Sequence, residues 1–501
     1  MIKVKVVTKK KLLVSIISMA FLYLSNISCR PLRPQQDPSE NDSLELGKNQ
    51  QSKGRSRRGV WITSVNSNVY DSRENIRTHL QKLKALGFNT IYPVVSNKGM
   101  TIYPSKISAL KLGISIDPRY RGRNVLRELT EEAAQVGLIV IPWLESGLKV
   151  PFSVTRRVEG KPVTQNYPIA NQAKTRGWLL TLANGAHKKD DYINNASWGF
   201  LDPTNPEVVN YFQELVIEII SQRGVAGIML DDHFSIDPEF EAGKKYKNDA
   251  LQWCKEVSCK GSDSEKIERY SVEKIISLVS AISKTVHSGA EGGRQWKALI
   301  LAPGGGQNFT RNGSRQDWHE IARRGLVDEI IIQTYRYSLA SFLQEIAKME
   351  LRRVRQSYQR PVGVAILAGI GNNNDPKKSV SGNLLYQQVR AARKAGYDIS
   401  FFYSDSLFRP ALAQQESMEE RQCWIESLFK DNAPCKNLKN KPEPPELPRE
   451  NSESETDPAL DTGFHEIEPD QTNFDTSPIL DNRLEQEPPE NPKVDSSAAG
   501  T

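Results

Sequence analysis

Histidine and cysteine are scarce in this sequence, which has six histidines and five cysteines among 501 residues. No spacing of these residues matches a structural zinc site, which needs four nitrogen or sulfur ligands. No glycine-rich turn carries the Lys-Ser/Thr pair of a phosphate-binding loop. The run Gly304–Gly306 lacks that pair and is expected instead to let a substrate approach the backbone closely. We therefore expect no metal and no cofactor.

A hydrophobic run that would span a membrane comfortably is also missing near the N-terminus. The apolar run Leu12–Leu24 is too short for that, but it follows a lysine-rich start at residues 3–11, as in a secretory signal. Cys29 favours a lipoprotein signal, although Asn26 stands where such signals favour leucine. A cleaved soluble product and an uncleaved anchor are the alternatives. We expect residues 1–29 to be a signal sequence and the protein to be exported, either periplasmic or anchored at the membrane by a lipid on Cys29.

The other four cysteines form two local pairs, Cys254 with Cys259 and Cys423 with Cys435. An even number suits disulfides in an exported protein, and these pairs are the favoured choice among three formal connectivities. Free thiols in a reducing compartment are the alternative.

Acidic residues are concentrated at the C-terminal end of a chain whose net charge is +7. Residues 441–501 hold 16 acidic against 4 basic residues and ten of the 28 prolines, with little apolar periodicity. Such a segment buries too little apolar surface to fold by itself. We expect a polar linker over 30–57, a globular domain over 58–432 and a disordered, acidic, proline-rich tail over 433–501.

The basic charge of the globular part does not indicate a nucleic-acid partner, because no Lys/Arg stripe is interleaved with aromatics and no nucleic-acid motif is present. Anionic envelope polymers or a membrane surface are more plausible partners for an exported basic protein, and a plain solvated surface is the alternative.

Short apolar runs alternate with amphipathic helical patterns from residue 59 onward, the pattern of βα units. Eight runs are expected to be strands: Gly59–Val65, Thr90–Val95, Leu138–Leu144, Val225–Leu230, Ala298–Ala302, Glu329–Thr334, Val362–Leu367 and Ile399–Tyr403. Helices are expected at Arg73–Leu86, Asn124–Val136, Pro206–Arg223, Glu265–His287, Arg315–Arg324, Leu339–Leu351 and Leu384–Ala395. This order predicts an α/β fold, a (β/α)8 TIM barrel with a long loop after the third strand. An open doubly wound sheet is the alternative.

Carboxylates stand at the ends of several expected strands, where TIM barrels place their active sites. Glycoside hydrolysis needs two carboxyl groups beside the scissile bond. Asp231 is the first candidate, as nucleophile or base, and Asp232 is a second. Because strand residues alternate faces, we expect these two side chains to point to opposite sides. Glu145, in an otherwise apolar run, is the candidate acid/base, since a partly desolvated setting raises the pKa of an acid. Structural ion pairs or helix caps are the alternatives.

Other side chains on the same rim are candidates for binding substrate. Aromatic rings stack on sugars, and polar groups bond their hydroxyls; the candidates are Trp143, Trp198, Tyr335, Arg336, His233, Asp405 and Asp202. Asp202 is explained nearly as well by the start of the next helix. The long connection Ser146–Leu201 is expected to form a cleft wall. Asp231-Asp232-His233 also suggests a metal site, but no second histidine-rich strand end accompanies it.

Several of these segments resemble the glycosyl-hydrolase-like 10 family over about residues 56–410. The resemblance is carried by five blocks in order: Arg58–Thr63, Gly87–Tyr92, Leu201–Pro203 with Asn205–Val208, Gly227–Phe234 and Arg324–Glu329. That family comprises exported bacterial proteins, many of them lipoproteins, with a barrel related to alpha-amylase-type hydrolases. The resemblance implies hydrolysis of an envelope glycan, with peptidoglycan strands as the favoured substrate.

The same resemblance places a nucleophilic aspartate at Asp231 and an acid after the fifth strand, where this chain has Ala302-Pro303-Gly304 and no carboxylate. His233 stands where many relatives have tyrosine. The expected function is therefore glycoside hydrolysis, with a polysaccharide as partner and the acid unassigned. A glycan-binding protein without catalysis and a scaffold lipoprotein are the alternatives.

Overall fold

The structure, a computed structural model, describes residues 56–65, 67–158, 161–191, 195–291, 296–369, 379–431 and Cys435. The expected signal sequence, almost all of the linker and, apart from Cys435, the acidic tail lie outside the described residues, so these boundaries stay predictions. Among the helices that the structure describes, none is both long and apolar enough to cross a bilayer.

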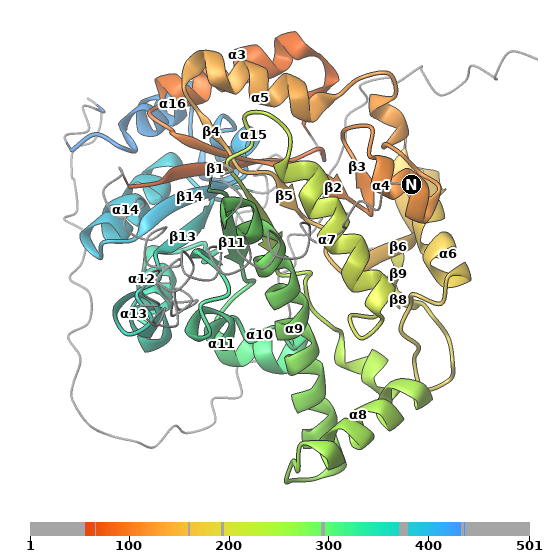
Figure 1. Ribbon diagram of the computed structural model, residues 1–501. Coiled ribbons are helices and arrows are strands. Elements are labelled where there is room, and N and C mark those ends of the chain that lie inside the picture. Colours follow the sequence, from red (N-terminus) through yellow and green to blue (C-terminus); the bar gives the residue numbers. More distant parts are fainter. Residues whose placement is uncertain are drawn as a thin grey trace, which may run out of the picture. The chain divides into compact units, whose positions relative to one another are not determined.

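Parallel strands form a closed eight-stranded barrel with helices around it (Figure 1). In chain order these are β1 (Arg58–Ile62), β2 (Thr90–Asn97), β4 with β5 (Ile139–Val140 and Trp143–Leu144), β10 (Gly227–Asp231), β11 (Ala298–Ala302), β12 (Glu329–Gln333), β13 (Val362–Leu367) and β14 (Asp398–Phe402). β1 pairs in parallel with both β2 and β14, which closes the barrel. The predicted TIM barrel is confirmed, and every expected strand is present.

The third barrel strand is divided into β4 and β5 at Ile141 and Pro142. Proline has no N–H for a strand ladder, but the carbonyl of Pro142 still accepts a hydrogen bond from the Met229 amide at 2.8 Å. Met229 and Leu230 lie in register with Trp143 and Leu144. The third strand is therefore interrupted without opening the barrel.

Helices connect the strands in the order that the sequence predicts. They are α3 (Arg73–Ala85), α5 (Val125–Val136), α7 (Pro206–Ile220), α9 (Asp263–Glu291), α11 (Trp318–Arg323), α12 (Leu339–Ile346) with α13 (Met349–Gln356), and α14 (Gly382–Lys394). Asn205 caps α7 by accepting a hydrogen bond from the Glu207 amide, ahead of Pro206 at the first turn. Gly137 ends α5 in the left-handed conformation, at φ 66°.

Four further helices were not expected from the sequence: α4 (Lys106–Leu112), α8 (Lys244–Glu256), α10 (Gln307–Ser314) and α16 (Met418–Ser427). The short α15 (Ser404–Leu407) follows β14, and the two-residue β3 (Met100–Thr101) extends β2 as a hairpin. α8 buries only Tyr246, Ala250 and Cys254, spaced four residues apart. Such a narrow apolar stripe is a weak sequence signal for a helix.

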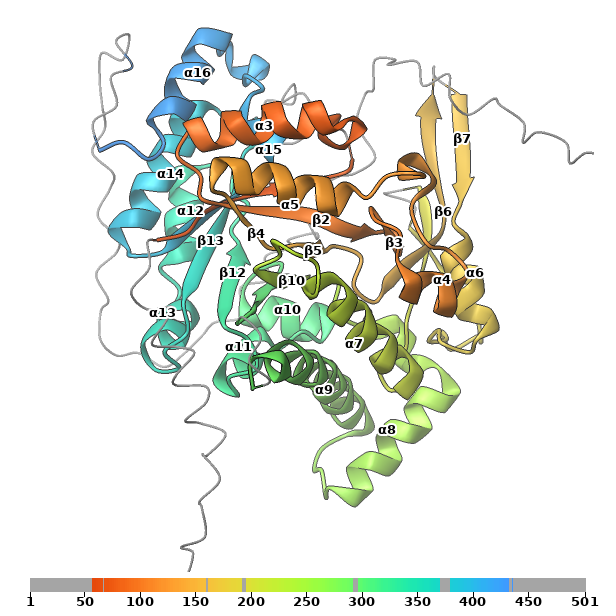
Figure 2. The same cartoon turned by 45° about the horizontal axis from the view of Figure 1, so that its top comes forward.

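The connection after the third strand is a folded insertion rather than a loop. It contains the antiparallel strands β6 (Lys149–Val158), β7 (Lys161–Asn166), β8 (Lys189–Asp191) and β9 (Ala196–Phe200), in the order β7-β6-β9-β8, together with α6 (Pro168–Thr175). Figure 2 shows this second sheet beside the barrel strands. Leu148, at its start, donates its amide to the carbonyl of His233, after β10, at 2.8 Å. The insertion is thus bonded directly to the barrel mouth.

Two disulfides join Cys254 to Cys259 and Cys423 to Cys435, as expected. The second links α16 to the end of the described chain. α16 is also held by Arg421, which is 1% exposed. Its guanidinium donates to four backbone carbonyls, those of Leu407, Val380, Ala368 and Ser406, and pairs with Glu416. One side chain therefore ties α16 to the segments that follow β13 and β14.

Replacing Arg421 by methionine should destabilise the barrel by about 3–5 kcal/mol, because a buried charge partner and several carbonyl oxygens lose their donor together. Urea denaturation measures the change. The control is Arg323→Met, which removes an exposed pair with Glu320 on α11 and should change the stability by less than about 1 kcal/mol. Equal, small effects of both substitutions would contradict the role given to Arg421.

Candidate active site

β10 carries Asp231 to the carboxyl end of the barrel. All five residues of the strand are buried, and Asp231 itself is 4% exposed. Its Oδ1 accepts a hydrogen bond from Gln333 Nε2, at the end of β12, at 3.0 Å, and another from the Asp232 amide at 2.9 Å. Gln333 also donates to the carbonyl of Ala302, the last residue of β11, at 3.2 Å. The orientation of the Asp231 carboxyl group is therefore fixed from neighbouring strands.

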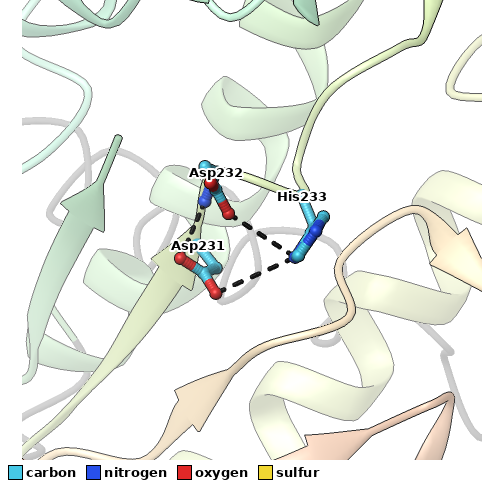
Figure 3. Close-up of side chains that lie close together, drawn as sticks. All are labelled: Asp231, Asp232 and His233. Carbon is cyan, nitrogen blue, oxygen red and sulfur yellow. Dashed lines mark hydrogen bonds and ion pairs between the residues drawn. The ribbon is translucent and has the colours of Figure 1, made fainter. Parts of the chain in front are cut away.

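Asp231, Asp232 and His233 form a compact group at the end of β10 (Figure 3). His233 Nδ1 lies 4.0 Å from Asp231 Oδ2 and 3.5 Å from Asp232 Oδ1. A carboxylate oxygen of Asp231, one of Asp232 and a ring nitrogen of His233 all lie within 4.8 Å of one another. Both carboxylates thus face the same histidine, so the expectation that they point to opposite sides is wrong. β10 ends at Asp231, and the strand alternation no longer applies to Asp232.

His233 is oriented by the loop after β5. Its Nδ1 lies 3.0 Å from the backbone carbonyl of Glu145, so Nδ1 carries a proton and donates it to that oxygen. Gly147, in the same loop, allows the loop to pass close to the backbone of His233: it has φ 48°, and a Cβ there would lie 2.4 Å from the carbonyl oxygen of His233. A metal ion bound through Nδ1 would have to replace the bond to Glu145.

Two glutamines that the sequence analysis did not single out hold this group in place. Gln333 orients Asp231, and Gln316, which is fully buried, donates from Nε2 to the carbonyls of Asp231, Asp232 and Phe234 at 3.0, 3.3 and 3.2 Å. Gln333 stands near the end of an expected strand, where barrels place their functional side chains, and this was a usable signal. Gln316 gave none, because its partners lie more than 80 positions away in sequence.

The electrostatics of the site are dominated by burial of negative charge. Burial raises the pKa of the Asp231 carboxyl well above its ordinary value, the neighbouring charges of Asp232 and Glu145 raise it further, and His233 opposes them. Burial also raises the pKa of the Tyr335 phenol, and Asp231, Asp232 and Glu145 add to that shift. Three carboxyl groups and one tyrosine therefore share this site, and Asp231 tends to retain a proton.

Two of the expected aromatic residues, Tyr335 and Trp143, pack against Phe402. Tyr335 stacks on Phe402, with ring centroids 5.4 Å apart, and Trp143 meets Phe402 edge-on at 6.2 Å. Trp143 is 3% exposed, so its ring face is not open for stacking on a sugar. Its indole Nε1 is buried without a hydrogen-bond partner among the described residues. Trp143, Tyr335 and Phe402 thus form an aromatic cluster, and Tyr335 lies close enough to Asp231 for the two groups to interact electrostatically.

The remaining candidates are less tightly gathered. Glu145 is 6% exposed, and its charge helps to raise the pKa of Asp231. Asp405, in α15, interacts instead with Tyr70: burial is the main cause of the raised pKa of Tyr70, and the charges of Asp405 and Glu145 add to it. Arg336 pairs with Glu345 at 2.6 Å, so its guanidinium is engaged by a carboxylate outside the Asp231 group.

Two candidates have local roles of their own. Asp202 accepts from the Thr204 amide at 2.8 Å, just before α7, which is the turn role that the sequence left open. Trp198 lies in β9 of the insertion, with Lys149 Nζ 4.7 Å from its ring centroid.

Comparisons with known proteins agree on the kind of fold and family. A model of the family described as "Glycosyl hydrolase-like 10" matches residues 56–383. A curated protein of Escherichia coli K12, "Glycosyl hydrolase DigH", is 26% identical over 313 residues, which cover 56% of this chain and 65% of the relative. This chain therefore spans just under two thirds of that relative's length.

Among solved structures, the glycoside hydrolase domain of PgaB (BpsB) from Bordetella bronchiseptica aligns with a TM-score of 0.52 at 11% identity, over 75% of this chain and 100% of that one. The catalytic domain of a beta-amylase from Paenibacillus polymyxa aligns with a TM-score of 0.50 at 10% identity, over 75% and 98% of the two chains. At such low identity these structures support the barrel fold alone.

The buried Asp231 carboxyl should make the protein less stable as the pH rises. Its folded pKa is raised, so its stabilising contribution is complete below the ordinary aspartate pKa of about 3.9 and is lost as the pH rises through the folded pKa. Asp231→Asn cannot ionise and keeps the acceptor for Gln333. It should therefore be more stable than the wild type at neutral pH, by about 1 kcal/mol or more.

Thermal unfolding across the acidic to neutral range measures this difference, which should shrink as the pH falls. Asp431→Asn, at a 90% exposed side chain, is the matched control and should shift the curve equally little at every pH. A wild type that is more stable than Asp231→Asn at neutral pH would show that the buried carboxylate is favourably paired instead.

Proposed function

Because the chain belongs to the glycosyl hydrolase-like 10 family, we propose that it hydrolyses glycosidic bonds of a bacterial envelope glycan, with peptidoglycan strands as the favoured substrate. The proposal is supported by the family match over residues 56–383 and by a curated relative that bears a glycosyl hydrolase name. The observation that carries it is the buried carboxyl of Asp231 beside the more exposed one of Asp232, at the carboxyl end of β10.

The two aspartates have environments that suit opposite roles. Asp231 is buried and its pKa is raised, so it is the group that holds a proton for the leaving oxygen. Asp232 has a side chain that is 32% exposed, so water and a sugar ring both have access to it. It is the group that attacks the anomeric carbon or activates water. This reverses the role expected for Asp231 from its sequence position, where it was the nucleophile or base.

The short distance between the two aspartate carboxyl groups supports the retaining rather than the inverting geometry of glycoside hydrolysis. A carboxylate oxygen of Asp231 and one of Asp232 lie within 4.8 Å of each other. Retaining glycosidases separate their carboxyl groups by about 5 Å, whereas inverting enzymes leave roughly 6.5–9.5 Å for a water molecule. Glu145, which acts on Asp231 from the loop after β5, is the third carboxyl group, and its charge helps to raise the pKa of Asp231.

A cellular location in the envelope belongs to the same proposal. The lysine-rich start, the apolar run Leu12–Leu24 and Cys29 are the layout of a lipoprotein signal. A lipid on Cys29, followed by the linker of residues 30–57, would tether the barrel beside a membrane-proximal glycan. The two disulfides fit an oxidising compartment.

A glycan-binding protein without catalysis is the second candidate function. It is favoured by the fifth strand, which ends in Ala302-Pro303-Gly304 with no carboxylate. The two functions predict the same ligand and differ only in whether a bond is broken.

Purified peptidoglycan strands incubated with the protein should therefore gain reducing ends. Asp231→Asn and Asp232→Asn should each lower that rate by roughly 10²–10⁴-fold, as expected for loss of an acid or base group. The control is Asp202→Asn, at the turn before α7, which should keep most of the activity. A wild-type protein that binds the strands but releases no reducing ends would establish the glycan-binding function instead.

Gly304 provides a second test, through the position of Asp232. A Cβ at residue 304 would lie 2.7 Å from Asp232 Oδ2, closer than such contacts allow. Gly304→Ala should displace that carboxylate and lower the rate of hydrolysis by roughly 10²-fold, as a misplacement of about 1 Å does. Gly313→Ala, in α10, has no atom within 4 Å of its new Cβ and should leave the rate unchanged. Hydrolysis by Gly304→Ala at the wild-type rate would count against Asp232.

A further inference from the structure

Three consecutive glycines follow β11 at the barrel mouth, and each leaves room for a different neighbour. A Cβ would lie 2.7 Å from Asp232 Oδ2 at Gly304, 3.3 Å from Phe309 Cδ1 at Gly305 and 3.2 Å from Lys348 Nζ at Gly306. The indole N–H of Trp318, a fully buried residue, donates to the Gly305 carbonyl at 3.1 Å. The loop Gly304–Gly306 is therefore held in place by the buried side chain of Trp318, and its three residues carry no side chains.

Phe309, in the first turn of α10, is unusual in its exposure. It is 48% exposed, and it is the only aromatic among the large hydrophobic side chains that are exposed in the described part of the chain. Phe234, Phe240 and Phe401 are each completely buried. One edge of the Phe309 ring covers Gly305, and much of the rest of the ring is open to solvent. The exposed face of this ring is available to contact a ligand.

The exposed ring lies close to the proposed catalytic pair. A Cβ on Gly304 would lie 2.7 Å from Asp232 Oδ2, and one on Gly305 would lie 3.3 Å from Phe309 Cδ1. Because adjacent Cα atoms are about 3.8 Å apart, the Asp232 carboxylate and the Phe309 ring lie within about 13 Å of each other. A glycan bound at Asp232 and extending over the glycine loop would therefore reach Phe309 within a few sugar residues. Backbone without side chains allows the glycan to lie close to that loop.

We propose that Phe309 is a stacking platform for a sugar residue a few units along the glycan from the bond cleaved, with the loop Gly304–Gly306 lying between them. This inference rests on the proposed function and adds a subsite to it. The apolar C–H face of a pyranose ring packs on the face of an aromatic ring, as apolar surface does elsewhere. The platform makes affinity depend on the length of the glycan, because only a chain long enough to pass Gly305 contacts Phe309.

Binding is measured without cleavage in an Asp231→Asn background, by calorimetry with peptidoglycan glycan fragments of disaccharide, tetrasaccharide and hexasaccharide length. Phe309→Ala should weaken binding of the longest fragment by about tenfold, the size expected for loss of one aromatic contact, and leave the shortest unchanged. Phe309→Tyr keeps the ring and should bind normally. Phe309→Leu keeps an apolar side chain without a flat face and should bind like Phe309→Ala.

The same substitutions in the otherwise wild-type protein separate this inference from the proposed function. Phe309→Ala should raise KM for long strands about tenfold with kcat little changed, and thermal unfolding should show that its fold is intact, as expected at an exposed site. If the wild type cleaves the strands and Phe309→Ala cleaves and binds fragments of every length equally well, the platform is refuted and the hydrolase stands. If the wild type neither binds nor cleaves any fragment, both are refuted.

Discussion

Burial of one carboxyl group at the end of β10 is the constraint on which the proposed chemistry depends. Asp231 is 4% exposed, and Tyr335, which interacts with it, packs on Phe402, so water does little to stabilise the Asp231 charge. Among the described residues, hydrogen bonds to one of its oxygens, Oδ1, come from the side-chain amide of Gln333 and the backbone N–H of Asp232. The other oxygen, Oδ2, lies 4.0 Å from His233 Nδ1, and burial raises the pKa of this carboxyl group well above its ordinary value.

The barrel holds this unfavourable group because several separate strands fix its surroundings. Gln333 comes from β12, the carbonyl of Glu145 comes from the loop after β5, and Gln316 comes from the loop before α11. Each contact joins segments that are distant in sequence, so displacing Asp231 requires breaking several of them together. A closed barrel suits this purpose, since its strand ends converge on a single rim. The favourable packing of the rest of the barrel thus offsets the free-energy cost of burying Asp231.

The sequence predicted the architecture well because each element carries its own local signal. Eight apolar runs and seven helical patterns fell at the right places, and Asn205-Pro206 and Gly137 marked helix ends by local backbone chemistry. The insertion after the third strand was expected only as a loop, because its strand β7 is exposed along its whole length and lacks the apolar alternation of a half-buried strand. The helices α4, α8 and α10 bury few residues, so the hydrophobic periodicity of their sequences was too weak to predict them.

At the candidate site, the sequence placed Asp231, Asp232, His233 and Glu145 on one rim, because residues that end parallel barrel strands must meet there. It did not determine which way Asp232 turns after β10 ends, nor that Arg336 is engaged by Glu345 and Trp143 is covered. Nor did it reveal that Gln316 holds the loop or that Phe309 lies exposed beside Gly305. Hydrophobic periodicity and the ends of strands depend on residues that are close together in the sequence, so they can be recognised from the sequence alone. Burial, pKa shifts and contacts across the rim arise only when distant segments pack together, so the tertiary structure alone decides them.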